Sequence, residues 1–378
     1  MEIIDLEDFL KIFHKPPQTY NDFINKTSVR LGSQLRPLKQ YIKEKQIPIT
    51  DIKLLFENIQ NRNEYLTRFY NLSLMIREDK LILSNIKPMK NRHFDNNHES
   101  LCKNLIRNIH YKDILQNTKS GIENIPTFIE MLKDLYLKNI IDYKILTPSS
   151  LFYQKNGRLG SVFSSYYFRA SILNPYLIYS LNHSLLKGTK IFTPTLGWSS
   201  YCYGFLECPH VLEYVGTDVI PQVCKITKEL AEIVAPEKRT TIYCKPSEDL
   251  FETTEFMKQY REHFDVVFFS PPYYKLEMYE GKDQSTERYK TYEEWLAGYW
   301  EKTIQLCHHV LEKHGKLCYI LSGYGSENTK EQYDLLGDMN NITKKYFKFH
   351  SQQPMYNKNV NVTKHRETGE QIMVFVKI

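Results

Sequence analysis

Short cysteine pairs are missing from this sequence of 378 residues. The seven cysteines are an odd number and none forms a C-x-x-C pair, so the sequence indicates neither a disulfide framework nor a zinc ribbon. Scattered thiols of this kind are typical of a reducing, intracellular setting. The run Cys307-His308-His309 fits one helix better than a metal site, and we expect no metal.

Long apolar runs are missing as well. The longest, residues 266–269 and 372–376, are far too short to cross a bilayer, so no membrane partner is expected. The first ten residues, MEIIDLEDFL, are acidic rather than basic, which fits neither a secretory signal nor a transit peptide. No repeat or low-complexity tract stands out, and the length predicts two domains.

Positive charge is concentrated towards the amino end. Residues 11–120 hold 20 Lys+Arg against 10 Asp+Glu, a net charge of +10, whereas the whole chain carries +6. The remaining residues therefore sum to −4. A basic amino-terminal half predicts a polyanionic partner, although lysines on solvated helices would give the same count.

The spacing of apolar residues changes near residue 150. Before it, apolar residues recur at three- and four-residue steps, as in 125–140, which predicts a mainly helical domain over residues 1–150 with a loop at 85–100. After it, short apolar strands alternate with helices, at 189–195, 212–218, 240–246, 265–270, 316–323 and 371–378. This alternation predicts an α/β domain over residues 151–378, with a doubly wound parallel sheet between two layers of helices.

Two helices between these strands have clear end signals. The segment 220–234 is amphipathic, with a proline at its start. The segment 291–315 opens with Thr291 and Glu294 in a capping-box pattern and closes on Gly315, which we expect as a left-handed C-cap. Ligands bind doubly wound sheets at the carboxyl ends of the strands, so the functional prediction rests on the residues there.

Three strand ends carry glycine or polar residues. Gly197 follows the first strand, where it permits a tight turn beside a ligand, and Ser199 or Ser200 caps the next helix. Asp218 ends the second strand and either accepts hydrogen bonds from the ribose hydroxyls of a nucleoside or caps a helix. The third strand ends in PSED, residues 246–249, whose acceptors either meet a purine amino group or form a helix cap.

The fourth strand ends in Ser270-Pro271-Pro272-Tyr273, where two prolines stop the ladder. An exocyclic amino group on a nucleobase is a poor nucleophile because its lone pair is delocalised into the ring. Ser270 and the carbonyl of Pro271 are acceptors that draw the amino hydrogens and free that lone pair. Tyr273 offers a flat face on which an extruded base stacks. A proline turn at a sheet edge explains the prolines but not the serine and tyrosine beside them.

From residue 158 to 378, about 60% of the chain, these motifs resemble the AdoMet-dependent amino-methyltransferases of DNA. The signature of that family is (Asp/Asn/Ser)-Pro-Pro-(Tyr/Phe/Trp). A narrower group of phage, large-virus and bacterial enzymes is similar over an extended run, which stands here at Ser270, Pro271, Pro272, Tyr273, Glu277, Tyr279, Gln284, Ser285 and 289–295. The resemblance says little about residues 1–150, which we assign to DNA binding and target recognition on their charge.

The resemblance implies a Rossmann-like class I methyltransferase sheet with S-adenosyl-L-methionine (AdoMet) as cofactor and no metal. It implies methyl transfer to N4 of cytosine or N6 of adenine in DNA, catalysed by Ser270, Pro271, Pro272 and Tyr273. The residues implied in cofactor binding are Thr193, Gly197, Trp198, Ser199, Asp218, Val219, Ser247, Glu248 and Asp249. Those implied in substrate binding are Glu277, Gln284 and Ser285. The segment 164–181 resembles the helix that precedes the first strand and closes over the cofactor.

Two departures from the family pattern concern the cofactor. Thr193 stands where the first strand commonly ends in an acidic residue, and LGWSS replaces a glycine-richer GWGGR. Methylation at C5 of cytosine is not expected, because that chemistry needs a nucleophilic Pro-Cys and the chain has only the reverse order, Cys208-Pro209.

Several substrates remain open at this point. Ser270 slightly favours cytosine as the target base, because the family's adenine enzymes more often carry Asp or Asn at this position. RNA, the less favoured substrate, and a protein glutamine side chain would suit the same chemistry. A nucleic-acid-binding protein with a degenerate transferase core is the alternative of another class, suggested by Thr193. The sequence does not predict the recognition sequence, the oligomeric state or a partner nuclease. The expected location is intracellular, in the cytoplasm, or in the host cytoplasm or nucleus if the protein is viral.

Overall fold

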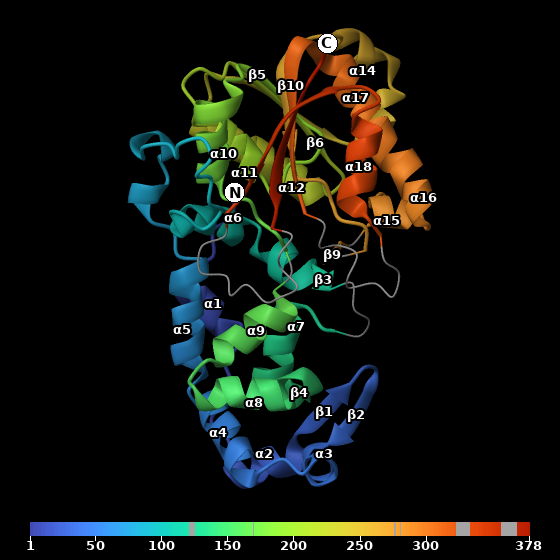
Figure 1. Cartoon of the computed structure of the whole chain (residues 1–378). Coiled ribbons are helices and arrows are strands. Elements are labelled where there is room, and N and C mark those ends of the chain that lie inside the picture. The colour runs from blue at the N-terminus through green and yellow to red at the C-terminus, as the bar shows by residue number, and fades with distance from the viewer. Residues whose placement is uncertain (121–124, 169, 276, 280, 323–332, 357–368) are drawn as a thin grey trace.

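The computed structural model describes residues 1–378 except 121–124, 169, 276, 280, 323–332 and 357–368. Figure 1 shows an elongated molecule with a twisted sheet and its flanking helices at one end. The N-terminal region, residues 1–167, forms most of the other end. Within the described ranges, no helix is long and apolar enough to cross a membrane.

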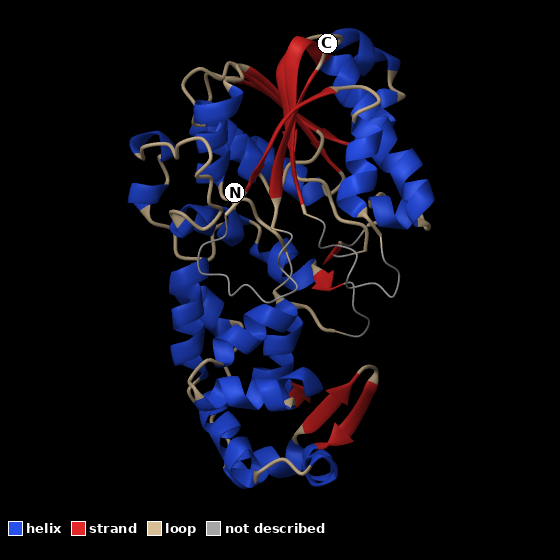
Figure 2. Cartoon of the chain, viewed as in Figure 1, coloured by secondary structure: helices blue, strands red, loops and turns tan. Residues whose placement is uncertain are grey.

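Seven strands form the large sheet, in the order β11-β12-β10-β8-β5-β6-β7. They are β5 (Lys190–Thr193), β6 (Glu213–Asp218), β7 (Arg239–Cys244), β8 (Phe264–Phe269), β10 (Leu311–Leu321), β11 (Lys348–Pro354) and β12 (Gln371–Val376). Strands β7, β6, β5, β8 and β10 are parallel, while β12 is antiparallel to β10 and β11. Figure 2 shows this sheet in red among blue helices.

The chain order reverses beside β5. From β5 the chain runs outward through β6 and β7, and it then returns to the other side of β5 to form β8 and β10. A doubly wound sheet opens a crevice at such a reversal, outside the carboxyl ends of its strands. The predicted fold class is confirmed, and the reversal lies between the paired strands β5 and β8.

The central strands are buried because helices cover both faces of the sheet. Buried Val, Ile and Phe residues fill β5 and β8, as expected for parallel strands covered on two sides. Figure 1 shows one group of helices on each side. The first group is α10 (Pro175–Leu181), α11 (Ser200–Leu206) and α12 (Pro221–Val234), and the second includes α13 (Ser247–Phe251), α14 (Thr254–Gln259), α17 (Lys302–Val310) and α18 (Leu335–Thr343).

All six predicted strands are present, but the sequence does not predict the seventh, β11. This strand, KFHSQQP, lies at the sheet edge and most of its residues are exposed, so no apolar run marks it. The predicted helix 220–234 is confirmed as α12, with Pro221 at its first turn.

The prediction that Gly315 caps a helix is wrong. The capping box of Thr291 and Glu294 is confirmed at the start of α16 (Tyr292–Trp295), but the following helices end at Val310 and β10 begins at once. Gly315 lies inside β10, where the pairing with β8 shifts register. A Cβ on Gly315 would lie 2.9 Å from the Glu312 carbonyl oxygen, so close packing at the shift explains the glycine.

The segment 164–181 is two helices rather than one. Helix α9 (Leu159–Tyr167) ends, and α10 begins only at Pro175, where the Asn174 side chain accepts from the Tyr176 amide as an N-cap. Asparagine followed by proline starts a new helix, which the apolar spacing alone does not reveal. The residues between these two helices become part of a cavity wall, described below.

The N-terminal region is mainly helical. Its α-helices are α1 (Leu6–Lys11), α2 (Tyr20–Lys26), α3 (Leu38–Lys45), α4 (Ile49–Gln60), α5 (Arg62–Ser73), α6 (Asn104–Ile109), α7 (Phe128–Lys133), α8 (Pro148–Lys155) and α9. A small sheet, not predicted, joins β1 (Ser28–Leu31), β2 (Gln34–Pro37) and β4 (Ile140–Asp142). Helix α8 spans the domain boundary predicted at residue 150 and α9 lies beyond it, yet α8 packs against α4 and α9 against α7. The loop predicted at 85–100 lies between two short 3₁₀ helices, which end at Asn85 and begin at Ser100.

One carboxylate joins the amino ends of the two strands at the reversal. Asp265, at the start of β8, accepts hydrogen bonds from the Thr189 amide at 2.8 Å and from the Lys190 amide at 3.1 Å. The Thr189 hydroxyl donates to it as well, at 2.6 Å. This junction lies at the amino edge of the sheet, opposite the edge at which ligands bind.

Candidate active site

A cavity of about 390 Å³ lies at the carboxyl ends of β5, β6, β7 and β8. Its volume is in the range of small-molecule pockets. Twelve of the predicted site residues line it: Gly197, Trp198, Asp218, Val219, Ser247, Glu248, Ser270, Pro271, Pro272, Tyr273, Gln284 and Ser285. Thr193, Ser199 and Asp249 do not line it, and the side chain of Glu277 lies outside the described residues.

The hydrogen bonds of Ser270 fix the role that its hydroxyl can play. Ser270 Oγ lies 3.1 Å from the carbonyl oxygen of Ile320 in the neighbouring strand β10. A carbonyl cannot donate, so the serine hydroxyl hydrogen is committed to Ile320. The lone pairs of Ser270 Oγ remain, and the hydroxyl can act towards the cavity only as an acceptor.

The rest of the turn presents a second acceptor and an aromatic face. Pro271 is buried, and no residue in the described part of the chain donates to its carbonyl oxygen. Pro272 has no amide hydrogen with which to compete. Tyr273 is half-buried, and its hydroxyl accepts from the Ser322 amide at 3.1 Å, which holds the ring at the cavity wall.

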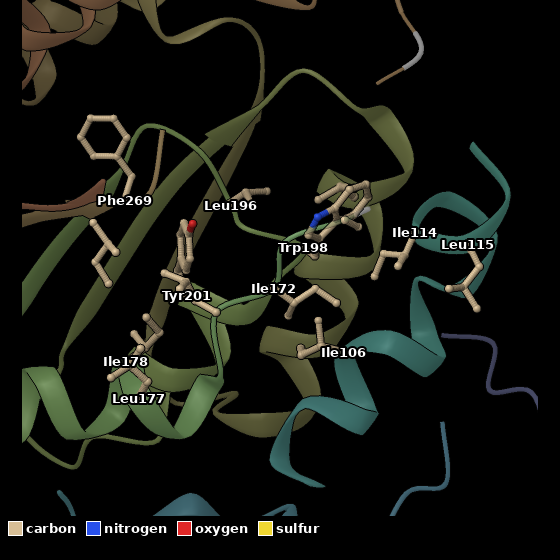
Figure 3. Close-up of a cluster of buried hydrophobic side chains, with 14 of the residues drawn as sticks. Ile106, Ile114, Leu115, Ile172, Leu177, Ile178, Leu196, Trp198, Tyr201 and Phe269 are labelled. Carbon is tan, nitrogen blue, oxygen red and sulfur yellow. The ribbon is translucent and has the colours of Figure 1, made fainter. Parts of the chain in front are cut away.

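Tyr201 connects this turn to the loop after β5, although the sequence did not single it out. The Tyr201 hydroxyl accepts from the Ser270 amide at 3.2 Å. The Tyr201 ring packs edge-on to Phe268 of β8, with centroids 5.1 Å apart. A Cβ on Gly197 would lie 2.2 Å from that ring, so only glycine permits this approach. Figure 3 shows Tyr201 with Leu196 and Phe269 around it.

Three successive residues of the loop after β5 adopt left-handed conformations. Their φ angles are 52° for Gly197, 58° for Trp198 and 66° for Ser199. Glycine adopts such angles freely, but tryptophan and serine do so at some expense in free energy, which neighbouring contacts must offset. Trp198 packs edge-on to the rings of His110, 5.9 Å away, and Tyr279, 5.6 Å away. Figure 3 shows Trp198 on the side of the loop that faces α6.

A buried chain of hydrogen bonds holds Ser199 in place. Thr227 of α12 donates to the carbonyl of Val223, so the Ser199 hydroxyl must be the donor to Thr227, at 2.7 Å. The serine hydrogen is then used, and His110 Nε2 must donate to Ser199 Oγ, also at 2.7 Å. Burial lowers the pKa of His110 to about 3, so the imidazole is neutral and carries its hydrogen on Nε2. Ser199 therefore shapes the loop from behind instead of lining the cavity.

Asp218 joins two loops at the strand ends. Its carboxylate accepts from the Leu196 amide at 3.1 Å, from Val219 at 2.8 Å and from Ile220 at 3.2 Å. Burial raises the pKa of Asp218, and these three backbone hydrogen bonds oppose that shift. The N-cap residue of α12 is Ile220, so Asp218 does not cap that helix. An asparagine would keep two acceptor bonds and turn an NH₂ group towards one of the amides.

The acidic residues after β7 are engaged by an arginine. Arg288 donates to Glu248 at 2.9 Å and to Asp249 at 2.6 Å. Glu248 still lines the cavity, whereas Asp249 does not. Burial raises the pKa of the Glu248 carboxyl, although Arg288 lowers it. Ser247 lines the cavity too, and its hydroxyl lies 2.8 Å from that of Thr303.

The same arginine fixes the segment that carries Gln284 and Ser285. Arg288 ends the short helix α15 (Ser285–Arg288), and Gln284 is its N-cap residue. Ser285 Oγ accepts from the indole of Trp295 at 3.0 Å. Two of the three predicted substrate residues, Gln284 and Ser285, thereby lie on a tethered segment of the cavity wall.

Thr193 is the predicted cofactor residue whose surroundings differ most from the expectation. It is fully buried in the sheet, and its hydroxyl lies 2.6 Å from that of Tyr214. The side chain therefore packs within the sheet layer and does not reach the cavity.

Other lining residues were not predicted. Tyr299 contributes a buried hydroxyl with no hydrogen-bond partner in the described structure. Lys103 and Arg107 come from the N-terminal region, and residues 170–173 come from the chain between α9 and α10. No strand end marks these positions in the sequence. Among the described residues, no group of three His, Cys, Asp or Glu side chains could hold a metal ion.

Comparisons with known proteins give distant likenesses only. The sequence matches no family profile and no curated protein. Among solved structures, TrmN from Thermus thermophilus is 13% identical, with a TM-score of 0.36 over 55% of this chain and 49% of that one. The N-methyltransferase NodS from Bradyrhizobium japonicum, in complex with S-adenosyl-L-homocysteine, is 13% identical, with a TM-score of 0.33 over 53% and 83%. The PH0226 protein from Pyrococcus horikoshii is 14% identical, with a TM-score of 0.36 over 58% and 97%. Likeness at this level leaves the activity and substrate of this chain open.

Proposed function

We propose that this chain is an AdoMet-dependent methyltransferase that acts on the exocyclic amino group of cytosine (N4) or adenine (N6) in DNA. The observation that carries the proposal is the acceptor pair at the end of β8. Ser270 Oγ has its hydrogen committed to Ile320, and the Pro271 carbonyl is left without a donor in the described structure. Two rigid acceptors suit an amino group whose hydrogens must be drawn aside.

The cavity residues fit the cofactor. Buried polar atoms without partners, the Tyr299 hydroxyl and Arg107 Nε, face a cavity in which a bound molecule would pair them. Gly197 brings backbone to the cavity wall, and Asp218 and Glu248 supply acceptors at the ends of β6 and β7. AdoMet, when bound, supplies a methyl group on a sulfonium, and its transfer releases one amino hydrogen as a proton.

The chain's own residues orient the base. Ser270 and the Pro271 carbonyl accept the two amino hydrogens, which frees the nitrogen lone pair from conjugation with the ring. The Tyr273 ring, fixed through Ser322, stacks on the extruded base. Tyr201 keeps Ser270 in register with the cofactor loop, since it contacts both.

RNA is the less favoured substrate of the same chemistry, and a degenerate nucleic-acid-binding protein is the alternative of another class. Calorimetry with AdoMet separates the enzyme from the binding protein. We assign DNA contact to the N-terminal region because of its positive charge. Helix α3 is the part of that region to test, since Lys39, Lys43 and Lys45 are exposed on it and none has an ion-pair partner in the described structure.

The first prediction identifies the product. Incubation with labelled AdoMet and DNA, digestion to nucleosides and mass spectrometry should yield N4-methylcytosine or N6-methyladenine. Ser270→Ala should lower turnover by about 10- to 100-fold, the loss of one hydrogen bond in the transition state, with AdoMet and DNA affinities near those of the wild type. The matched control is Ser184→Ala, because the Ser184 hydroxyl also donates to a backbone carbonyl, that of Met89, away from the cavity. Equal turnover in both variants would refute the role of Ser270.

The second prediction concerns base stacking. Tyr273→Ala should lose ~1–3 kcal/mol of stabilisation of the extruded base. Fluorescence of 2-aminopurine at the target position should therefore fall in Tyr273→Ala and persist in Ser270→Ala. Tyr273→Phe keeps the ring and loses the bond to Ser322, so its signal should persist too. A 2-aminopurine signal in Tyr273→Ala equal to that of the wild type would refute the stacking role of Tyr273.

The third prediction concerns Asp218. Asp218→Asn should weaken AdoMet binding by roughly 1.5–3 kcal/mol, the range for lost charged hydrogen bonds. It should also lower the thermal stability of the free protein, because the Leu196 amide would face a donor. Asp265→Asn is the matched control, since that carboxylate also accepts backbone amides but lies at the opposite edge of the sheet. Calorimetry should show normal AdoMet affinity in Asp265→Asn, and equal weakening in both variants would mean a loss of stability alone.

The fourth prediction concerns DNA. Replacing Lys39, Lys43 and Lys45 of α3 by glutamine should flatten the dependence of log K on log salt by about 0.9 for each phosphate that the protein no longer neutralises. AdoMet affinity should not change, because α3 lies far from the sheet in Figure 1.

The control for this test is a triple glutamine variant at Lys225, Lys228 and Lys258, which are exposed on α12 and α14. It removes the same charge from the other end of the molecule. An identical salt slope in the two triple variants would show that net charge, and not α3, sets the DNA affinity.

A further inference from the structure

Two cations from the N-terminal region reach the cavity. Lys103 ends the 3₁₀ helix Ser100–Lys103, and Arg107 follows within α6. Residues four apart on a helix share a face, and both of these side chains line the cavity. Only 4% of Lys103 is exposed, so it is not an ordinary surface lysine.

Neither cation has a carboxylate partner in the described structure. Lys103 Nζ donates to the side-chain oxygen of Asn97 at 3.0 Å, and Arg107 donates to that of Asn104 at 3.5 Å. The guanidinium also lies over the Phe168 ring, 5.9 Å from its centroid, but its Nε is buried without a partner. Both side chains therefore keep N–H groups that could donate to a further acceptor.

Four other buried or half-buried cations in the described chain are better satisfied. Arg288 binds two carboxylates, and Lys377 pairs with Glu262 at 3.1 Å. Lys316 donates to two backbone carbonyls, and so does Lys238. The difference at Lys103 and Arg107 indicates a missing anion, because an uncompensated buried charge is strongly unfavourable.

The electrostatics agree with this geometry. Burial and, to a lesser extent, the neighbouring Arg107 lower the pKa of Lys103 to about 7, while Glu370 and Asp95 act in the opposite direction. Burial lowers the pKa of Arg107 to about 10. A bound anion would stabilise the charged form of both groups.

The cavity carries charges of both signs, and Lys245 beside β7 and Glu370 near Lys103 also line it. Asp218 and Glu248 lie at the ends of β6 and β7, and Lys103 and Arg107 lie on the wall formed by the N-terminal region. A molecule with hydroxyl and amino groups at one end and a carboxylate at the other would match this arrangement. AdoMet has this distribution of groups.

We propose that Lys103 and Arg107 bind the carboxylate at the amino-acid end of the cofactor, so that the N-terminal region completes the cofactor site. This inference rests on the proposed function. A phosphate of nucleic acid offers similar chemistry, but the burial of Lys103 favours a small ligand inside the cavity over a duplex outside it.

The test measures affinity, by calorimetry on the full chain, for AdoMet and for its decarboxylated analogue. The wild type should prefer AdoMet by at least 10-fold. Lys103→Met and Arg107→Met should each weaken AdoMet binding by about 10- to 100-fold, yet bind the decarboxylated analogue as well as or better than the wild type does. Lys245→Met is the matched control, because Lys245 lines the same cavity beside β7. Its preference for AdoMet should equal that of the wild type.

Several outcomes would overturn the inference. A preference for AdoMet that persists in Lys103→Met and Arg107→Met would place the carboxylate elsewhere. Normal AdoMet affinity with weakened DNA binding in those variants would identify a phosphate site instead. Methionine keeps an unbranched side chain and removes a desolvated charge, so the thermal stability of the two variants should not fall below that of the wild type. If Arg107→Met does not fold, Lys103→Met alone suffices for the test. If the wild type binds neither compound, the proposed function itself is refuted. If the wild type binds AdoMet but the two variants keep its preference, only the assignment of Lys103 and Arg107 is refuted.

Discussion

The hydrogen bond from the Ser270 amide to the Tyr201 hydroxyl is the contact on which the candidate site depends. Ser270 directly follows β8, and Tyr201 stands at the start of the helix after β5, so the bond joins the ends of the two strands at which the chain order reverses. The same ring fills the space that glycine leaves at position 197. One buried side chain therefore sets the distance between the proline turn and the left-handed loop, and neither can move without the other.

A second connection runs from the N-terminal region into the same loop. His110 follows α6 and donates to Ser199, which donates to Thr227 of α12. The Val223 carbonyl, the last acceptor, fixes which group donates in each hydrogen bond of this series. With Lys103 and Arg107 on the same stretch of chain, α6 lies at the cavity of the large sheet although it precedes the sheet in sequence by some distance. A boundary drawn at residue 150 separates the sequence patterns but not the residues around the cavity.

Much of the fold follows from the sequence, and the exceptions have physical causes. Apolar runs predict the buried strands, and the capping box at Thr291 predicts a helix start correctly, because both signals are local. The turn after β8 is predicted for the same reason. Gly315 misleads because glycine serves close packing in β10 as readily as it serves a helix end. Tyr201, Lys103 and Arg107 escape prediction because they come together at the cavity only when distant segments meet. The acceptors of Asp218 and Asp249 are predicted by position, but the sequence does not reveal that backbone amides and Arg288 already occupy much of their capacity.

The loop after β5 also affects how much conformational entropy is lost on folding and how much on ligand binding. Ser199 keeps a left-handed conformation that glycine would adopt more easily. A serine has fewer backbone states than a glycine in the unfolded chain, and here its hydroxyl is held at both ends. The torsions of the loop are thus restricted during folding, before any ligand arrives. Less conformational freedom is left to lose on binding, so the chain would bind its ligand with a preorganised loop where a glycine-rich loop would have to become ordered.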